Sequence, residues 1–142
     1  MPLPSAVKFT KNGVEYVSQV EKVGYTIAEL TRAALRDCGK LITREARKRA
    51  RRKTGRVRRS IQYWLRKREG DLQVGYKPLG FYGGFAELGT SKQAKEAALF
   101  NSVQDNLDEM RRIQGQYLSA IEDENRALGL IDESEVISDE NE

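Results

Sequence analysis

Ala50–Ile61 reads ARRKTGRVRRSI, and Tyr82–Thr90 reads YGGFAELGT. The first stretch is typical of a basic helix that stops at Thr54-Gly55 and gives way to a strand, because glycine just beyond a helix adopts the left-handed conformation without a Cβ clash. The second predicts a short strand, Phe85–Leu88, which leads through the turn Glu87-x-Gly89-Thr90 into a further helix. Together the two stretches predict the order helix, hairpin, short strand, helix.

A long helix is expected before the first stretch. Thr26-Ile27-Ala28-Glu29 has the form of a capping box, so the helix should begin there and run to about Lys53. Its apolar residues recur at spacings of three and four and form one buried stripe. The stripe consists of Ile27, Leu30, Ala34, Leu35, Cys38, Leu41, Ile42 and Ala46. Two or three cations would satisfy the helix dipole at the C-terminal end, so the excess of arginine there favours a partner.

Two hairpins are predicted on either side of this helix. Ala6–Thr10 and Val14–Ser18 flank Asn12-Gly13, the favoured pair for a type I′ turn, and place Phe9 opposite Tyr16 on an apolar face that needs cover. After Gly55, apolar residues alternate with polar ones on two further strands around the turn Glu69-Gly70-Asp71. The inward residues are Ile61, Tyr63 and Leu65 on one strand and Leu72, Val74 and Tyr76 on the other.

The remainder is predicted to be a loop, a helix and a tail. Residues 78–84 are rich in glycine and aromatic side chains and are interpreted as a mobile loop, with Phe81, Tyr82 and Phe85 as interface residues. A second helical stripe runs from about Ala97, with Gly129 as its stop. Its members are Phe100, Val103, Leu107, Met110, Ile113, Tyr117 and Ile121. Residues 133–142 hold few apolar side chains and should be disordered or folded only against a neighbour.

Charge is divided sharply along the chain, although the net charge is only +4. Residues 44–69 hold thirteen Lys and Arg against two acids, a net +11, whereas residues 122–142 hold nine acids against Arg126, a net −8. The basic cluster can attract phosphate or acidic protein, and the acidic tail can screen it, compete with it or pair with a neighbouring copy's cluster. A solvated helix face with a disordered tail is the other interpretation.

No catalytic constellation is present in the sequence. The chain has no histidine, and the single cysteine, Cys38, lies on the apolar stripe, which favours a buried small side chain over a reactive thiol. Glu87 could be an acid in a site, but a structural role, pairing with an arginine or capping backbone amides, is favoured. No apolar run approaches eighteen residues, so no membrane span is expected, and Met1–Pro4 does not resemble a signal peptide. No cofactor or metal site is predicted.

The Thr54-Gly55 and Glu87-x-Gly89-Thr90 motifs, in this order and context, resemble the HK97 gp10-like family of tailed-phage neck and tail-completion proteins. The resemblance runs from the long helix to the second helix. It implies an α+β fold with a long helix packed on a small curved antiparallel sheet, followed by a second helix. Where the family usually has a proline shortly before Thr-Gly this chain has Arg51, and Ala94–Phe100 lacks the usual Ala-x-Pro-Phe element. An earlier helix start, capped by Thr90 with Gln93, therefore stays open.

The expected organisation is one α+β domain, residues 1–130, with hairpin 6–18 and core 25–130, followed by the acidic tail 131–142. The resemblance implies a virion protein, assembled in the host cytoplasm, that forms a six-fold ring in the neck between head and tail and lines or surrounds the DNA conduit. Its partners would be copies of itself, neighbouring connector, tail-terminator or tail-tube proteins, and genomic double-stranded DNA. A nuclease or toxin has only basicity in its favour, whereas sequence-independent nucleic-acid binding is the main alternative. The predicted DNA or partner contacts are Arg44, Arg47, Lys48, Arg51, Arg52, Lys53, Arg56, Arg58 and Arg59.

Overall fold

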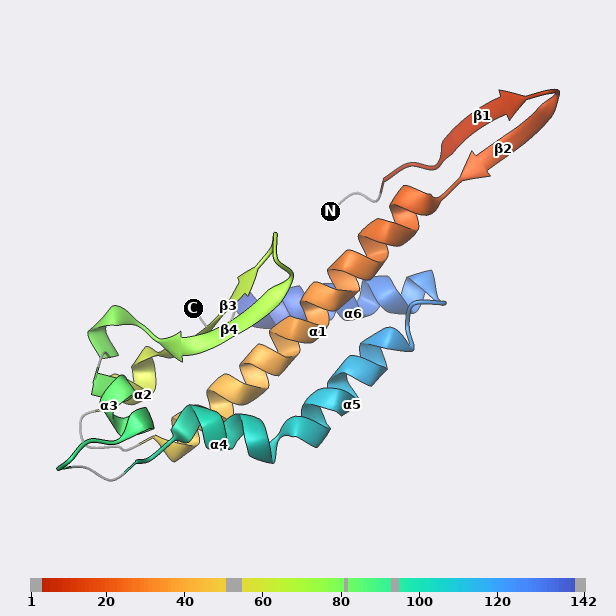
Figure 1. Cartoon of the computed structure of the whole chain (residues 1–142). Helices are drawn as coiled ribbons and strands as arrows, with labels where there is room; N and C mark the ends of the chain where they lie inside the picture. The colour runs from red at the N-terminus through yellow and green to blue at the C-terminus, as the bar shows by residue number, and fades with distance from the viewer. Residues whose placement is uncertain (1–3, 51–54, 81, 93–94, 140–142) are drawn as a thin grey trace. The chain divides into compact units, whose positions relative to one another are not determined.

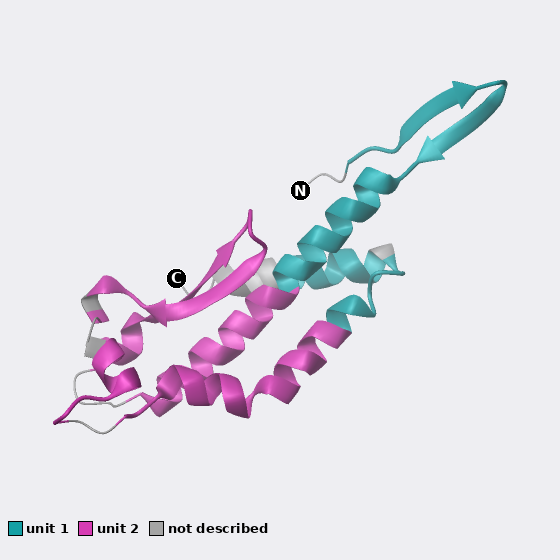
Figure 2. Ribbon diagram, in the orientation of Figure 1, with its two compact units in different colours: residues 1–33, 116–142 teal, residues 34–115 magenta. Residues whose placement is uncertain are grey.

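The computed structural model describes residues 4–50, 55–80, 82–92 and 95–139. It has an α+β fold, as predicted, with two separate two-stranded antiparallel sheets and a long helix, α1, shown in Figure 1. The chain divides into two compact units, residues 1–33 with 116–142 and residues 34–115, coloured separately in Figure 2. Helix α1 (Val20–Arg49) contributes its first part to one unit and its second part to the other.

The first unit begins with the predicted hairpin. Strands β1 (Val7–Lys11) and β2 (Val14–Ser18) pair around Asn12-Gly13, which both have positive φ, and Phe9 stacks on Tyr16 with ring centroids 5.2 Å apart. The type I′ prediction and the Phe9–Tyr16 register are thus confirmed. Helix α1 begins at Val20, so the predicted capping box is wrong: the Thr26 hydroxyl lies inside the helix and donates to the Lys22 carbonyl at 2.9 Å.

The second unit packs α1 against a second hairpin. Strands β3 (Ile61–Arg66) and β4 (Asp71–Tyr76) pair in the predicted register, with Tyr63 opposite Val74, and Arg66 forms an ion pair with Asp71 beside the turn. A Cβ on Gly39 of α1 would lie 2.8 Å from the Tyr63 ring, so this glycine permits the close approach of helix and sheet. The core of this unit gathers Ala46, Ala50 and Ile61, with Tyr76 and Leu99 packed against them.

A short helix, α2 (Arg56–Ser60), stands between the Thr-Gly turn and β3, where the sequence indicated a direct change to strand. Gly55, which precedes α2, has the predicted positive φ of 69°. Helix α1 ends at Arg49 and Ala50 is a bend, so the helix stops earlier than the predicted end at about Lys53, whereas residues 51–53 and Thr54 lie outside the described residues.

The predicted third strand and mobile loop are both wrong. Residues Pro78–Gly80 form a short 3₁₀ helix, η1, and Tyr82–Leu88 form helix α3, which includes the residues assigned to the strand. Glycine is a poor helix former, but a Cβ on Gly83 would come within 2.5 Å of the Tyr76 ring, so packing favours glycine at this place in α3.

The predicted second helix is divided into three. Helix α4 (Ala98–Asp105) and helix α5 (Leu107–Leu118) break at Asn106, which leaves the helical conformation at φ −112° and ψ 14°. Helix α6 (Glu124–Asp139) follows, so Gly129 lies inside a helix and does not stop one. The residues from 133 to 139, predicted to be disordered or folded against a neighbour, belong to α6. An earlier start of α4 at Thr90 is also wrong, whereas Gln93 lies outside the described residues.

Candidate interaction surfaces

Three arginines from two helices of the second unit line a surface pocket of about 380 Å³. Arg47 comes from the last turn of α1, Arg58 and Arg59 come from α2, and Gly55 completes the described lining. The left-handed turn at Gly55 immediately precedes α2. The turn at Gly55 therefore precedes a helix that brings cations eleven and twelve residues apart in the sequence to one place.

Arg47 is partly buried and structural. Its guanidinium donates a hydrogen bond of 2.7 Å from Nη2 to the carbonyl oxygen of Ile61, which fixes the end of α1 to the start of β3. Its Nε is buried and has no hydrogen-bond partner among the described residues. Buried donors are normally paired, so this atom has unused capacity for an acceptor.

Arg58 and Arg59 make no ion pair within the part of the chain that the structure describes. Arg58 is half-buried and Arg59 is exposed. No acidic side chain is among the described residues that line the pocket. Like charges held this close repel one another, so the pocket is a place where an anion is electrostatically favoured.

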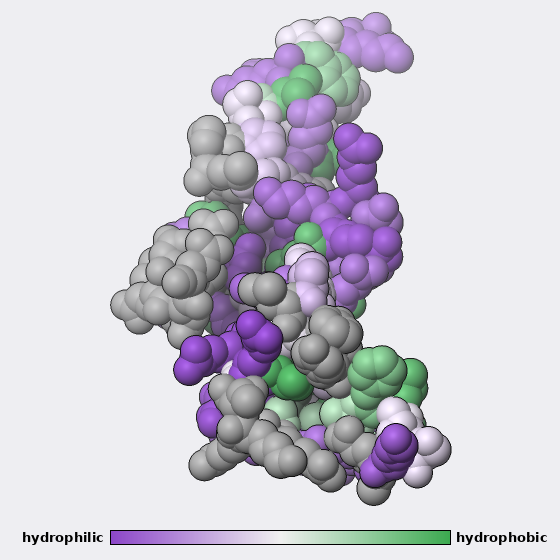
Figure 3. Space-filling model, turned by 90° about the vertical axis from the view of Figure 1, so that its left-hand side faces the viewer, coloured by the Kyte–Doolittle hydropathy of each residue, from purple (hydrophilic) through white to green (hydrophobic). Residues whose placement is uncertain are grey.

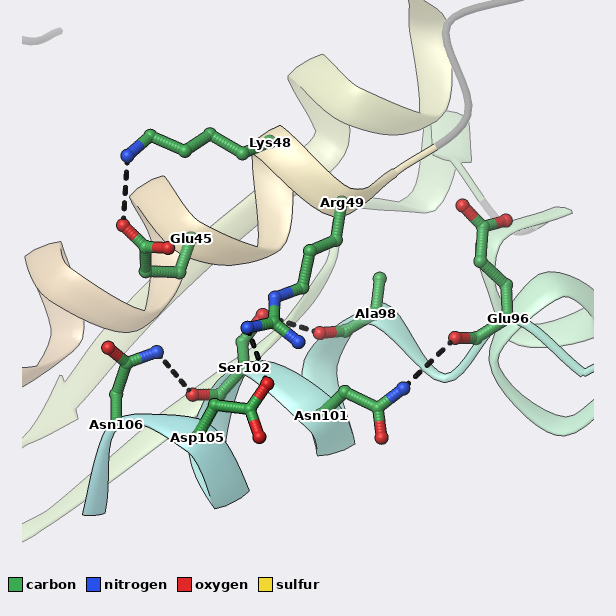
Figure 4. Close-up of polar contacts among 9 residues, drawn as sticks. All are labelled: Glu45, Lys48, Arg49, Glu96, Ala98, Asn101, Ser102, Asp105 and Asn106. Carbon is green, nitrogen blue, oxygen red and sulfur yellow. Dashed lines mark hydrogen bonds and ion pairs between the residues drawn. The ribbon is translucent and has the colours of Figure 1, made fainter.

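The other described cations of the basic cluster face different surroundings. Lys48 contacts Glu45 at 3.0 Å and Arg49 contacts Asp105 at 2.6 Å, as Figure 4 shows, whereas Arg44 lies 3.8 Å from Glu45. Such exposed pairs add little stability individually. Arg49 was not among the predicted contact residues, and its pairing with α4 could not be read from helix periodicity. Arg56 is exposed, and Arg51, Arg52 and Lys53 lie outside the described residues.

Glu87 has the structural role that the sequence favoured, as a cap for backbone amides. Its carboxylate accepts hydrogen bonds from the amides of Leu99 at 3.0 Å and Phe100 at 2.9 Å, the second and third residues of α4. The residue before α4, Ala97, is left-handed and its side chain cannot cap the helix. A carboxylate from α3 therefore supplies the acceptors and the negative charge that a helix N-terminus favours.

Tyr76 of β4 completes this arrangement. Its hydroxyl donates to Glu87 Oε2 at 3.3 Å, and burial together with the nearby carboxylate raises the pKa of Tyr76 well above its ordinary value. The Glu87 side chain thus joins three elements, β4, α3 and α4, and its role is to hold them together.

The Gly-Thr half of the motif shapes the connection between α3 and α4. Gly89 has φ 78°, its amide bonds to the Phe85 carbonyl at 2.8 Å, and a Cβ there would lie 3.0 Å from the backbone nitrogen of Lys95. The Thr90 hydroxyl accepts a hydrogen bond of 3.3 Å from the Lys92 amide. Position 89 therefore favours glycine for two reasons: the positive φ and the lack of room for a Cβ.

Of the predicted interface residues, Phe85 is exposed on α3, with 53% of its surface accessible. Leu88 of the same helix and Phe100 of α4 are also exposed. Phe81 lies outside the described residues, and Tyr82 is the first residue of α3.

The first unit carries an exposed apolar surface on residues 7–27, which we call the hairpin arm. Val7, Phe9, Val14 and Tyr16 share one face of the hairpin, and each is between 45% and 52% exposed. Figure 3 shows hydrophobic side chains at the surface of the hairpin, at the top of the view. The first turns of α1 add an exposed stripe at helical spacing: Val20, Val23 and Ile27. The sequence predicted an apolar hairpin face that needs cover, but it missed Val20 and Val23 because the helix was expected to start later. It also wrongly placed Ile27 in the buried stripe of the helix.

No three acidic or cysteine side chains gather among the described residues in a way that could hold a metal ion. Cys38 is buried, and this burial, with Asp37 nearby, raises the pKa of its thiol. Within the described ranges, no helix is both long and apolar enough to cross a membrane.

A match to one protein family includes the whole of the first motif-bearing stretch, residues 50–61, and all of the second except Thr90. The family is described as "Bacteriophage HK97-gp10, putative tail-component", and its model matches residues 15–89, more than half of the 142-residue chain. The chain belongs to the HK97-gp10-like family. The match covers β2, α1 and the elements through α3, and it ends at Gly89.

HK97-gp10-like proteins are described as tail components of bacteriophages, which gives this chain a structural role in the virion alongside other phage structural proteins. No curated protein and no solved structure shows a significant match to the chain. Strand β1 and helices α4 to α6 lie outside the residues matched to the HK97-gp10-like family.

Proposed function

We propose that this HK97-gp10-like protein forms a ring, of six copies, in the neck of the virion, where it joins the DNA-filled head to the tail and surrounds the DNA conduit. The observation that carries the proposal is the uncovered apolar surface of the hairpin arm. A single two-stranded hairpin is at best marginally stable in water, and here both of its faces are exposed. A chain that presents such a surface is suited to act by contact with neighbouring subunits and proteins.

The site chemistry supports a structural role. Glu87, the acid of the sequence motif, caps helix α4 by accepting hydrogen bonds from two backbone amides. The sequence contains no histidine, and its single cysteine is buried. Activity would have to be built from other residues, and we therefore propose a protein that acts by occupying a place in the particle.

Deletion of the gene from the phage that encodes this chain tests the proposal. We expect DNA-filled heads and separately built tails that fail to join, or tails whose upper end is incomplete, in negative-stain micrographs. Wild-type protein supplied from a plasmid should restore joined particles. Empty or immature heads would indicate an earlier packaging step, and joined, infectious particles without the protein would refute the proposal.

A matched pair of variants tests the hairpin arm in the same assay. Phe9→Ser with Tyr16→Ser removes the stacked apolar pair and should fail to restore joining, because a neighbouring protein would no longer find an apolar face to pack on. Lys8→Ser with Thr10→Ser changes the opposite face of β1 and should restore it. Equal restoration by both variants would assign assembly to another surface.

A second candidate, sequence-independent nucleic-acid binding, is favoured by Arg58 and Arg59, which are unpaired among the described residues. If they bind DNA phosphates, changing Arg51, Arg52, Arg58 and Arg59 to Ser should weaken duplex binding and lower the slope of log K against log salt by about 0.9 for each phosphate that is no longer neutralised. Arg111→Ser with Arg112→Ser is the control, since each of these arginines pairs with an acid on its own helix. Absence of DNA binding at low salt would assign the cluster to protein contacts.

A further inference from the structure

We propose that the arginine pocket of Arg47, Arg58 and Arg59 receives carboxylates from the acidic segment, residues 122–142, of a second copy of this chain. The inference rests on the proposed function, because it names a contact between neighbouring copies of the assembly.

The pocket is built to hold an anion. Three arginines line a space of about 380 Å³, and no acidic side chain is among the described lining residues. The Nε of Arg47 is buried without a partner among the described residues, while Nη2 of the same group is held by the Ile61 carbonyl. The guanidinium of Arg47 is therefore held in place by β3, and the side chains of Arg58 and Arg59 are the ones without an ion pair among the described residues. Guanidinium groups bind carboxylates through paired, charge-assisted hydrogen bonds.

Two described carboxylates of the acidic segment form no ion pair elsewhere in the described structure, whereas a third caps a helix. Asp123 caps α6 through the amides of Asn125 and Arg126. Asp132 and Glu133 on α6 are exposed and form no ion pair within the described ranges. The segment carries a net charge of −8, against +11 for residues 44–69 of the same chain. Complementary charges of this size steer association and fix its register.

A carboxylate suits the pocket better than a DNA phosphate does. A protein that surrounds a DNA conduit must let the duplex slide, and a pocket that holds a single phosphate through three arginines would oppose that movement. A contact between copies has no such conflict. Binding of DNA at the pocket would therefore contradict this assignment.

A partner copy can supply this contact, because the two complementary surfaces are separate surfaces of the same chain. The pocket belongs to residues 34–115 and the acidic segment to residues 116–142. Contacts between two different surfaces of identical subunits are heterologous, and they close into a ring when the rotation between subunits allows. One pocket and one acidic segment per copy give every copy in such a ring the same pair of contacts.

Self-association of the full-length chain tests the proposal, by native mass spectrometry and sedimentation velocity over a range of salt concentrations. A pocket variant, Arg58→Glu with Arg59→Glu, and a segment variant, Asp132→Lys with Glu133→Lys, should each weaken self-association roughly tenfold or more at low salt. Arg44→Glu with Lys48→Glu is the control for the pocket variant. It makes the same change of charge on the exposed face of α1, outside the pocket, and should have a smaller effect. Circular dichroism of each variant verifies that it is folded.

Mixing the variants gives the decisive result. Neither variant alone should assemble fully, but a chain with the pocket variant and a chain with the segment variant retain one intact pocket and one intact segment between them. The reversed segment of the second variant also matches the reversed pocket of the first, so the mixture should assemble with the two variants alternating and in equal numbers. Placing both changes in the same chain should restore self-association, because the charges are then exchanged across the contact.

Other results would overturn the proposal. Unchanged assembly of both variants, or a wild-type chain that stays monomeric at low salt, would show that this contact is not made. A concentration-independent change in melting temperature without a change in assembly would indicate pairing within one chain. Loss of duplex-DNA binding alone in the pocket variant would indicate phosphate as the ligand. The proposed function would still stand or fall on the particle morphology seen after gene deletion, independently of these results.

Discussion

Removal of the Glu87 carboxylate is the most direct test of what holds β4, α3 and α4 together within the second unit. The side chain accepts two backbone hydrogen bonds at the start of α4 and one from the Tyr76 hydroxyl. Loss of a helix N-cap costs about 0.5–2 kcal/mol, and loss of the Tyr76 bond about 0.5–1.5 kcal/mol. Glu87→Ala should therefore reduce the free energy of unfolding by about 1–3 kcal/mol.

Glu87→Gln should be milder, because glutamine keeps one oxygen acceptor and presents an NH₂ group to the other amide. We expect the free energy of unfolding to fall by about 1 kcal/mol, so that stability decreases in the order wild type, Gln, Ala. In a domain of this size, 1 kcal/mol lowers the melting temperature by about 3–4 °C. Thermal and urea denaturation followed by circular dichroism can resolve this order.

Amide hydrogen exchange gives the local readout that identifies the cap. Leu99 and Phe100 should exchange faster in both variants, by about tenfold for each 1.4 kcal/mol by which local stability falls. Glu69→Ala and Glu69→Gln are the controls, since Glu69 is an exposed acid in the β3–β4 turn. If Glu87→Ala leaves the melting temperature and these two amides unchanged, the carboxylate does not cap α4 in solution.

Three further results are expected. Gly89→Ala should destabilise the fold by about 1 kcal/mol or more, from its φ of 78° and the approach of the Lys95 backbone, whereas Gly84→Ala, inside α3 with open space at its Cβ, should be neutral or stabilising; equal melting temperatures would contradict this. Gly55→Val should also cost about 1 kcal/mol or more through its φ of 69°, and an unchanged melting temperature would argue against the left-handed turn. Because the pKa of Tyr76 is raised in the folded protein, the unfolded chain loses this proton first above about pH 10, and the free energy of unfolding should fall as the pH rises. Tyr76→Phe should make that fall smaller in urea titrations at several pH values. The same pH dependence in the variant and the wild type would count against a buried hydroxyl.

Local patterns in the sequence determined the elements whose signals are short in range or strongly periodic. Asn12-Gly13 specified the type I′ turn and the Phe9–Tyr16 register, because few residue pairs accept positive φ twice in succession. The stripe from Leu30 to Ala46 specified the long helix, and alternation specified β3 and β4. Local motifs also predicted a positive φ at Gly55 and a structural role for Glu87.

Tertiary packing decided the features that local patterns leave ambiguous. Residues 82–88 contain two glycines and are too short to show a period, and they form a helix in which Gly83 lies against the Tyr76 ring. The Thr26 capping box has a valid local form, yet α1 continues through it from Val20. The count of charges predicted the basic cluster. Only the tertiary structure shows which of its arginines share a pocket and which of its cations pair with neighbouring acids. The physical reason is the same in each case: a short segment has several conformations of similar free energy, and contacts made with distant residues select one of them.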